Sequence, residues 1–155
     1  MKRFFFAFAL LILSALSFAA PKRLTSYSDL VKALDSGRAV RLVAHYKKTK
    51  LIIDGKEEAA PDAVGGKTVD SWERFERGVI RNKLAYIAFS ETVLIGHPRY
   101  GHVYNYVRTR VFEDGTVEMT ARYLKTGTFE VVMDETFKGA INNGKNNEGI
   151  DLFSE

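Results

Sequence analysis

Residues 101–124 read GHVYNYVRTRVFEDGTVEMTARYL, and this stretch carries the clearest structural pattern of the sequence. Valine alternates with tyrosine and arginine up to Phe112, and apolar residues alternate with polar ones again from Val117. Alternation with a period of two is typical of a β-strand that buries one face. Between the two runs lies Glu113-Asp-Gly-Thr116, in which Gly115 suits the left-handed position of a hairpin loop. The stretch therefore predicts a β-hairpin.

One short helix is predicted before the strands begin. Ser26 can cap its N-terminus, with Asp29 three residues later as a capping-box-like partner. Leu30, Val31 and Leu34 form its apolar stripe, and Gly37 provides a stop signal just after it.

The remainder of the chain reads as further strands joined by turns. A long polar connection is expected at residues 54–67, and a flexible Gly/Asn/Lys segment at 139–149. The tail, residues 150–153, can dock as a short last strand. The other predicted strands span residues 40–46, 51–53, 69–75, 84–95 and 129–137.

These elements predict a mainly β or α+β fold. One N-terminal helix would pack on a curled antiparallel β-meander of about six strands. Because a long sheet curls, a half-barrel and a closed barrel are both allowed. The sequence contains no internal repeat and no sign of a second domain, so residues 20–155 are expected to form one domain.

The first nineteen residues carry the pattern of a cleavable signal peptide. Lys2 and Arg3 precede an apolar stretch, and the small residues Ser17 and Ala19 mark a cleavage site. Removal of residues 1–19 leaves 155 − 19 = 136 residues and lowers the net charge from +4 to 23 − 2 − 19 = +2. The expected location is the periplasm or the outside of a bacterial cell, without stable membrane insertion after cleavage.

Composition excludes several classes of protein. With 46% hydrophobic residues the chain can bury a core, so intrinsic disorder is not expected. It has no cysteine, which excludes a disulfide scaffold, a thiolate nucleophile and cysteine-based metal sites. We predict no metal and no cofactor, because His45, His97 and His102 match no zinc spacing and no nucleotide or phosphate motif is present. Export and a charge of only +2 argue against a nucleic-acid partner.

Four stretches of the chain share a family likeness: Ser28–Val40, the Gly65-Gly66 pair leading to Asp70, Ile87–Glu91 and Tyr106–Val117. They resemble the VirK family of small exported bacterial proteins, first noted in a plant pathogen's virulence region. The likeness runs from about Thr25 to Phe137 and implies a protein without an established activity or agreed functional residues. Relatives often place a cysteine near the position of Lys48, whereas this chain has none.

The densest group of functional side chains is His97-Pro-Arg-Tyr-Gly-His102. In a short connection it can act as a polar ligand clamp, with Arg99 for an anionic group and Tyr100 for stacking on a sugar. A second interpretation makes His97 or His102 a general base beside Tyr100 or Tyr104, as in lyases that act on acidic polysaccharides. A third is a solvated turn without a function.

The strand that follows offers a second candidate surface. Its alternating side chains Tyr104, Tyr106, Arg108 and Arg110 interleave aromatic and cationic groups, which suits an acidic glycan. Alternatively the tyrosines are buried and the arginines pair with acidic residues across the hairpin, such as Glu118. Trp72, the one tryptophan, is interpreted as a core anchor rather than a ligand platform.

Taken together, the sequence predicts an exported bacterial accessory protein that binds an envelope or extracellular polymer or a partner protein, with a possible link to virulence or a host. The alternative is a small lyase-like, carbohydrate-active enzyme that uses residues 97–102. Enzyme status is not supported, because no catalytic signature is present.

Overall fold

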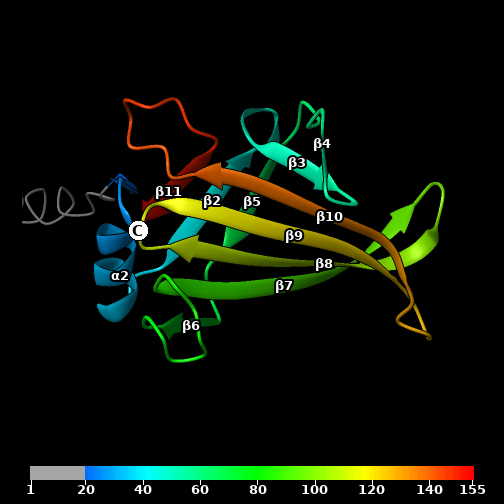
Figure 1. The fold of residues 1–155 in the computed structure, drawn as a ribbon, viewed down its shortest axis with the longest axis horizontal. Helices are drawn as coiled ribbons and strands as arrows, with labels where there is room; N and C mark the ends of the chain where they lie inside the picture. Colours follow the sequence, from blue (N-terminus) through cyan, green and yellow to red (C-terminus); the bar gives the residue numbers. More distant parts are fainter. Residues whose placement is uncertain (1–19) are drawn as a thin grey trace, which may run out of the picture.

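The computed structural model describes residues 20–155, and the predicted signal peptide at residues 1–19 lies outside them. In the described part, eleven strands form two antiparallel sheets, and one α-helix packs beside them (Figure 1). The fold is therefore mainly β with one helix, as the sequence predicts.

The larger sheet has seven strands in the order β4-β3-β10-β9-β8-β7-β6. Its long central strands are joined as two hairpins, β7–β8 and β9–β10, while β8 and β9 form the hairpin predicted from residues 101–124. Gly115, in the loop between β8 and β9, has φ +85°, the left-handed conformation expected of it. The strands are β3 (Lys50–Ile53), β4 (Lys56–Glu58), β6 (Trp72–Phe75), β7 (Tyr86–His97), β8 (Gly101–Phe112), β9 (Thr116–Lys125) and β10 (Val131–Ala140).

The smaller sheet has four strands in the order β1-β11-β2-β5. Its strands are β1 (Lys22–Leu24), β2 (Val40–His45), β5 (Val64–Thr68) and β11 (Ile150–Ser154). The C-terminal tail thus forms β11, a central strand between β1 and β2, and a short 3-10 helix (Tyr46–Lys48) follows β2.

Helix α2 (Tyr27–Asp35) begins and ends where the sequence indicates. The Ser26 hydroxyl accepts the backbone N–H of Asp29 at 3.1 Å, and Gly37 has φ +71° just beyond the last turn. The Asp29 carboxylate accepts the backbone N–H of Thr25 at 3.1 Å and its hydroxyl at 3.0 Å. Together with the contact to Ser26 and the charge of Lys32, these bonds hold the pKa of Asp29 below its ordinary value.

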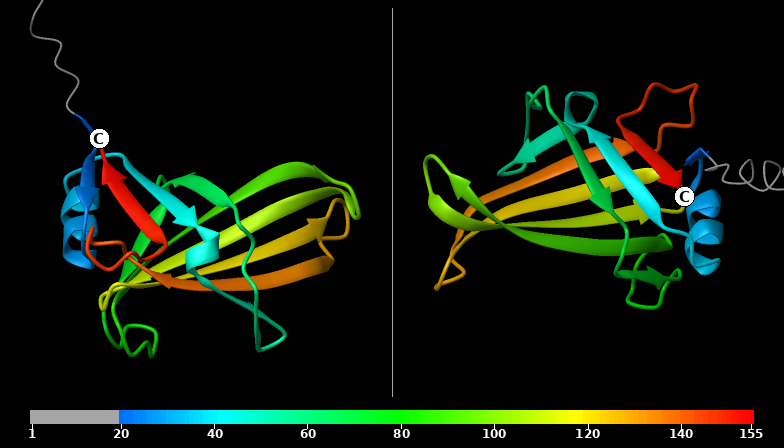
Figure 2. Two further views of the ribbon diagram at one scale, coloured as in Figure 1. Left: turned by 90° about the horizontal axis from the view of Figure 1, so that it is seen from above. Right: turned by 180° about the vertical axis from the view of Figure 1, so that it is seen from behind.

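The core lies between the two sheets and is closed at one end by α2. The smaller sheet crosses one face of the larger sheet near the helix, whereas the β7–β8 and β9–β10 hairpins continue well beyond it (Figure 2). Buried residues of both sheets and the helix form one apolar cluster; its fully enclosed members include Leu30, Leu42, Met119 and Leu152.

Two expectations about the strands are wrong. The expected single meander of about six strands, closed or half-closed as a barrel, is replaced by eleven strands in two separate sheets. The chain alternates between the sheets, passing from β2 to β3, back to β5 and then to β6, and local alternation of residue type does not reveal such crossings. Residues 54–67 are also not a loop throughout, because β4 and the start of β5 lie within them.

The segment 139–149 is partly strand. Gly139 and Ala140 end β10, and Ile141 makes an isolated bridge to Ile150. Beyond them, asparagine side chains accept backbone N–H groups within the segment, for example Asn143 from Lys145 at 2.9 Å. The flexibility of this segment stays a prediction.

Candidate functional site

Strand β8 presents its tyrosines and arginines to the outer face of the larger sheet, the face directed away from the smaller sheet. Val103, Val107 and Val111 are buried on the inner face. Since side chains alternate along a strand, the residues between them lie on the outer face. These residues are His102, Tyr104, Tyr106, Arg108, Arg110 and Phe112. The second candidate surface of the sequence is therefore a real sheet face, with its tyrosines half-buried and Arg108 exposed.

A hollow of about 580 Å³ lies on this side of the sheet, a volume typical of ligand sites. Tyr106 and Arg108 line it together with Glu73 of β6. Ala88 and Ser90 of β7 also line it, and their short side chains leave the space that the larger ones surround. We call it the outer hollow; its remaining lining residues are Asp70, Ser71, Trp72 and Phe89.

Arg108 is an exposed cation of the outer face. Arg110 pairs with Glu118 at 2.5 Å across the hairpin, as sequence reasoning allowed, and Arg122 pairs with Asp134 of β10 at 2.9 Å. Arg108 has no ion pair within residues 20–155. Its cross-strand neighbours are the hydroxyl residues Ser90 on β7 and Thr120 on β9. A guanidinium between hydroxyls can bind an anionic, hydroxylated group.

A second hollow of about 560 Å³ adjoins the first. Asp70, Ser71 and Ser90 line both, so the two lie on either side of the connection from β5 to β6. At this point Lys67 of β5 pairs with Glu91 of β7 at 3.2 Å, which ties the smaller sheet to the larger one. Only 12% of the Lys67 side chain is exposed, so this pair is more protected than the other lysine pairs of the described chain.

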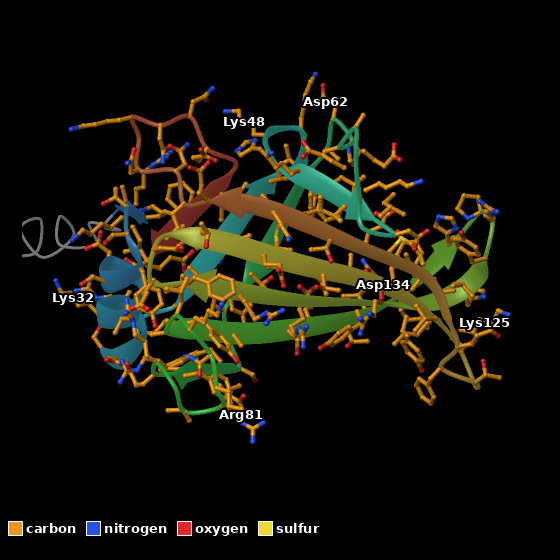
Figure 3. The ribbon with its side chains drawn as sticks, viewed as in Figure 1. Lys32, Lys48, Asp62, Arg81, Lys125 and Asp134 are labelled. Atoms are coloured by element: carbon orange, nitrogen blue, oxygen red, sulfur yellow. The ribbon has the colours of Figure 1, made fainter. Side chains whose placement is uncertain are left out.

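The residues of the first candidate group, 97–102, divide between the two faces of the sheet. His97 and Gly101 are paired across the β7–β8 hairpin, so His102 comes one position later and projects from the other face of the sheet. His97 stacks on Tyr100, with ring centroids 4.8 Å apart, and lies 5.1 Å from the Tyr123 ring. This cluster lies at the far end of the hairpins, which Lys125 marks in Figure 3.

His97 has a structural role in this turn. Its Nδ1 accepts the backbone N–H of Arg99 at 3.2 Å and that of Tyr100 at 3.3 Å. Acceptance at Nδ1 places the proton of the neutral ring on Nε2. Arg99 is exposed, with its guanidinium 5.4 Å from the centre of the Tyr100 ring. His97 therefore lies beside Tyr100 in a folded, aromatic hairpin end, while His102 projects from the opposite face, so the turn does not bring the two histidines to one site.

The remaining sequence candidates have these positions. Trp72 is half-buried and packs against the core, as its interpretation as an anchor requires, yet it also borders the outer hollow. His45 lies 3.2 Å from Asp151 and far in sequence from the other histidines. Among residues 20–155, no three His, Asp or Glu side chains cluster closely enough to hold a metal ion. In the same range, no helix has the length and apolar character needed to cross a membrane.

Sequence reasoning missed Asp70, Ser71, Glu73 and Ser90 as neighbours of Tyr106 and Arg108. They come from three different elements, and only the pairing of β6, β7 and β8 brings them to one place. One local signal was present, since Ser90 interrupts the apolar run that precedes it in β7.

The fold and the outer hollow define a class: a two-sheet, mainly β protein with a polar surface site and an unpaired arginine. The family model of the VirK protein matches residues 23–129, more than half of the chain. The chain belongs to the VirK family, as its sequence resemblance predicts.

A solved structure shares this fold. The crystal structure of a VirK family protein from Legionella pneumophila matches with a TM-score of 0.64 and 13% sequence identity, covering 84% of this chain and 98% of that one. At this identity the likeness concerns the fold alone. No curated protein matches the chain.

Proposed function

We propose that this VirK family member is an exported bacterial binding protein that takes an acidic, hydroxyl-rich polymer of the envelope or the extracellular space into the outer hollow. The observation that carries the proposal is Arg108, an exposed guanidinium beside the hollow with no ion pair in residues 20–155. A cation that is neither buried nor neutralised is available to a ligand. The signal-peptide pattern of residues 1–19 supports export.

The side chains around Arg108 suit such a ligand. A guanidinium can donate two parallel hydrogen bonds to one carboxylate or phosphate group. Ser90 is exposed beside it, and its hydroxyl can exchange hydrogen bonds with the ligand's own hydroxyls, whereas Thr120 on the other side is buried. The half-buried ring of Tyr106 offers an apolar surface with a polar edge, which suits the face of a sugar ring.

The arrangement also suits a chain rather than a single small molecule. The outer hollow adjoins the second hollow at Asp70 and Ser71, so consecutive units of a polymer can occupy both. Asp70 and Glu73 on the β6 side would repel a carboxylate, which directs the acidic group toward Arg108 and the sugar hydroxyls toward the acidic side.

Calorimetry with short acidic and neutral oligosaccharides tests the proposal. We expect binding of an oligogalacturonate, weaker binding at high salt and no binding of a neutral oligomer of equal length. The R108Q variant should lose at least about tenfold in affinity, since it removes a charge-assisted contact. Arg81 points into solvent from the β6–β7 loop and carries the matched control, R81Q, which should bind like the wild type (Figure 3). Equal affinity of R108Q and R81Q would overturn the proposal.

A further inference from the structure

Half of strand β7 has a free edge. Strand β6 pairs only with Tyr86–Phe89, whereas β8 follows β7 along its whole length to His97. In the described chain, residues 90–97 therefore have a strand on one side only. In Figure 1 this part of β7 twists upward and ends as the green arrowhead at the right, away from β6. Such an edge offers a row of unpaired backbone N–H and C=O groups.

This edge is also apolar on both faces. With the His97 ring neutral, residues 92–97 contain no charged side chain. Val93 and Leu94, which lie on opposite faces, are 44% and 54% exposed. Long, apolar, uncharged edges pair readily with other chains, and natural proteins usually block them.

The other sheet borders of residues 20–155 are blocked in the usual way. Each of them carries charged side chains or glycine along its edge strand, although the free part of β10 combines two carboxylates with the apolar residues 131–133. These residues are Lys22 and Arg23 on β1, Lys56, Glu57 and Glu58 on β4, Gly65, Gly66 and Lys67 on β5, Glu73 and Arg74 on β6, and Asp134 and Glu135 on the free part of β10. The far half of β7 stands apart from all of them.

We propose that a second copy of this chain pairs with the free edge of β7, antiparallel to it, about a two-fold axis at Leu94. The two four-stranded halves, β10-β9-β8-β7, then form one continuous sheet. A two-fold axis between identical antiparallel strands stands perpendicular to the sheet, so residues opposite each other must lie on the same face. Registers centred on a residue satisfy this condition, whereas registers centred between two residues do not.

The register centred on Leu94 is self-complementary. It sets Leu94 against its own copy on the outer face and Val93 against Ile95 of the second copy on the inner face. It also sets Glu91 against His97 of the second copy. His97 uses Nδ1 in its own turn, so its Nε2–H is free to donate to that carboxylate. Centring on Val93 instead would place Glu91 against Ile95, which leaves the carboxylate without a polar partner across the strand pair.

The pairing has a consequence for the outer hollow, and this consequence rests on the proposed function. In the Leu94 register, Ser90 lies opposite Pro98 of the second copy. The turn that carries Arg99 of the second copy thereby comes beside Ser90, which lines both hollows. The dimer would add a second cation next to Arg108 and so extend the site for an acidic polymer.

The oligomeric state of the purified protein, measured without any ligand, tests the pairing. Sedimentation velocity should show that the wild type is a dimer and that L94K is a monomer at the same concentration. The dimer dissociation constant of L94K should rise by at least about 100-fold, because two lysines then face each other at the axis. V131K is the matched control: Val131 is a similarly exposed apolar residue, 49%, on the outer face of β10 at the opposite border. A monomeric wild type, or equal dissociation of L94K and V131K, would overturn the proposal.

Engineered cysteines test the register, since the chain has no cysteine of its own. Under mild oxidation L94C should form a disulfide-linked dimer, because residues opposite each other at the axis approach closely enough for a disulfide. V93C should remain unlinked, since its opposite residue is Ile95. Linkage of V93C but not L94C would overturn the register. Because none of these measurements involves a ligand, a failed dimer and a failed Arg108 site give separate results.

Discussion

Truncation of Leu152 tests whether the C-terminal tail is a core strand. Leu152 is fully buried in β11, between Leu24 of β1 and Leu42 of β2. Leu→Ala at an enclosed site costs about 2–5 kcal/mol, since burial is lost and a cavity remains. Leu152 has neighbours on both sides in its own sheet and the larger sheet beneath it, so little collapse into the cavity is possible. We therefore expect L152A to lose about 3 kcal/mol of unfolding free energy.

Urea unfolding followed by tryptophan fluorescence measures this loss. With a slope of about 2 kcal/mol per molar urea for a chain of this size, the midpoint should fall by about 1.5 M. The matched control is F153A, one residue later on the outward face of the same strand, where the ring is half-buried under Arg23. It should lose about 1 kcal/mol. A loss below about 1 kcal/mol in L152A, or equal losses in the two variants, would mean that the tail is not a central strand.

Two further predictions concern packing and acid stability. A Cβ at Gly65 would lie 2.8 Å from the hydroxyl of Tyr46, and the Tyr46 ring is held against Phe137. By urea unfolding G65A should therefore cost about 1–3 kcal/mol, whereas G66A, with open space around it, should cost much less. A harmless G65A would contradict the packing of Tyr46. Hydrogen bonds from Thr25 lower the pKa of Asp29 in the folded protein below 3.8, so the ionised Asp29 stabilises the fold above that pH, and this stabilisation is lost as the pH falls through the lowered pKa. The thermal midpoint of D29N should therefore fall less between pH 5 and pH 2.5 than that of the wild type. Parallel curves of midpoint against pH for the two proteins would contradict this.

The elements that the sequence predicted correctly carry their signals locally. The β8–β9 hairpin follows from strict alternation and from Gly115 at the turn, and α2 follows from Ser26, Asp29 and Gly37. The smaller sheet is different. Strand β1 has three residues and pairs with β11, more than a hundred residues away, so neither strand has a pattern of its own that reports the pairing.

The candidate site divides in the same way. Tyr106 and Arg108 were found because alternation along one strand predicts which residues share a face. Ser90 and Asp70 join them through the pairing of β7 with β8 and through the crossing from β5 to β6, which local patterns do not contain. Residues 97–102 divide in the structure: His97 and Arg99 lie against the Tyr100 ring, whereas pairing of His97 with Gly101 puts His102 on the opposite face.

The most direct test of the account is an NMR titration of the protein with a short acidic oligosaccharide. Binding at the outer hollow predicts that the backbone amides of Ser90, Tyr106, Arg108 and Thr120 shift together and saturate with one affinity, and that R108Q abolishes these shifts. Shifts confined to the hairpin end at residues 97–102, or no shifts at saturating ligand, would contradict the assignment of the outer hollow as the binding site.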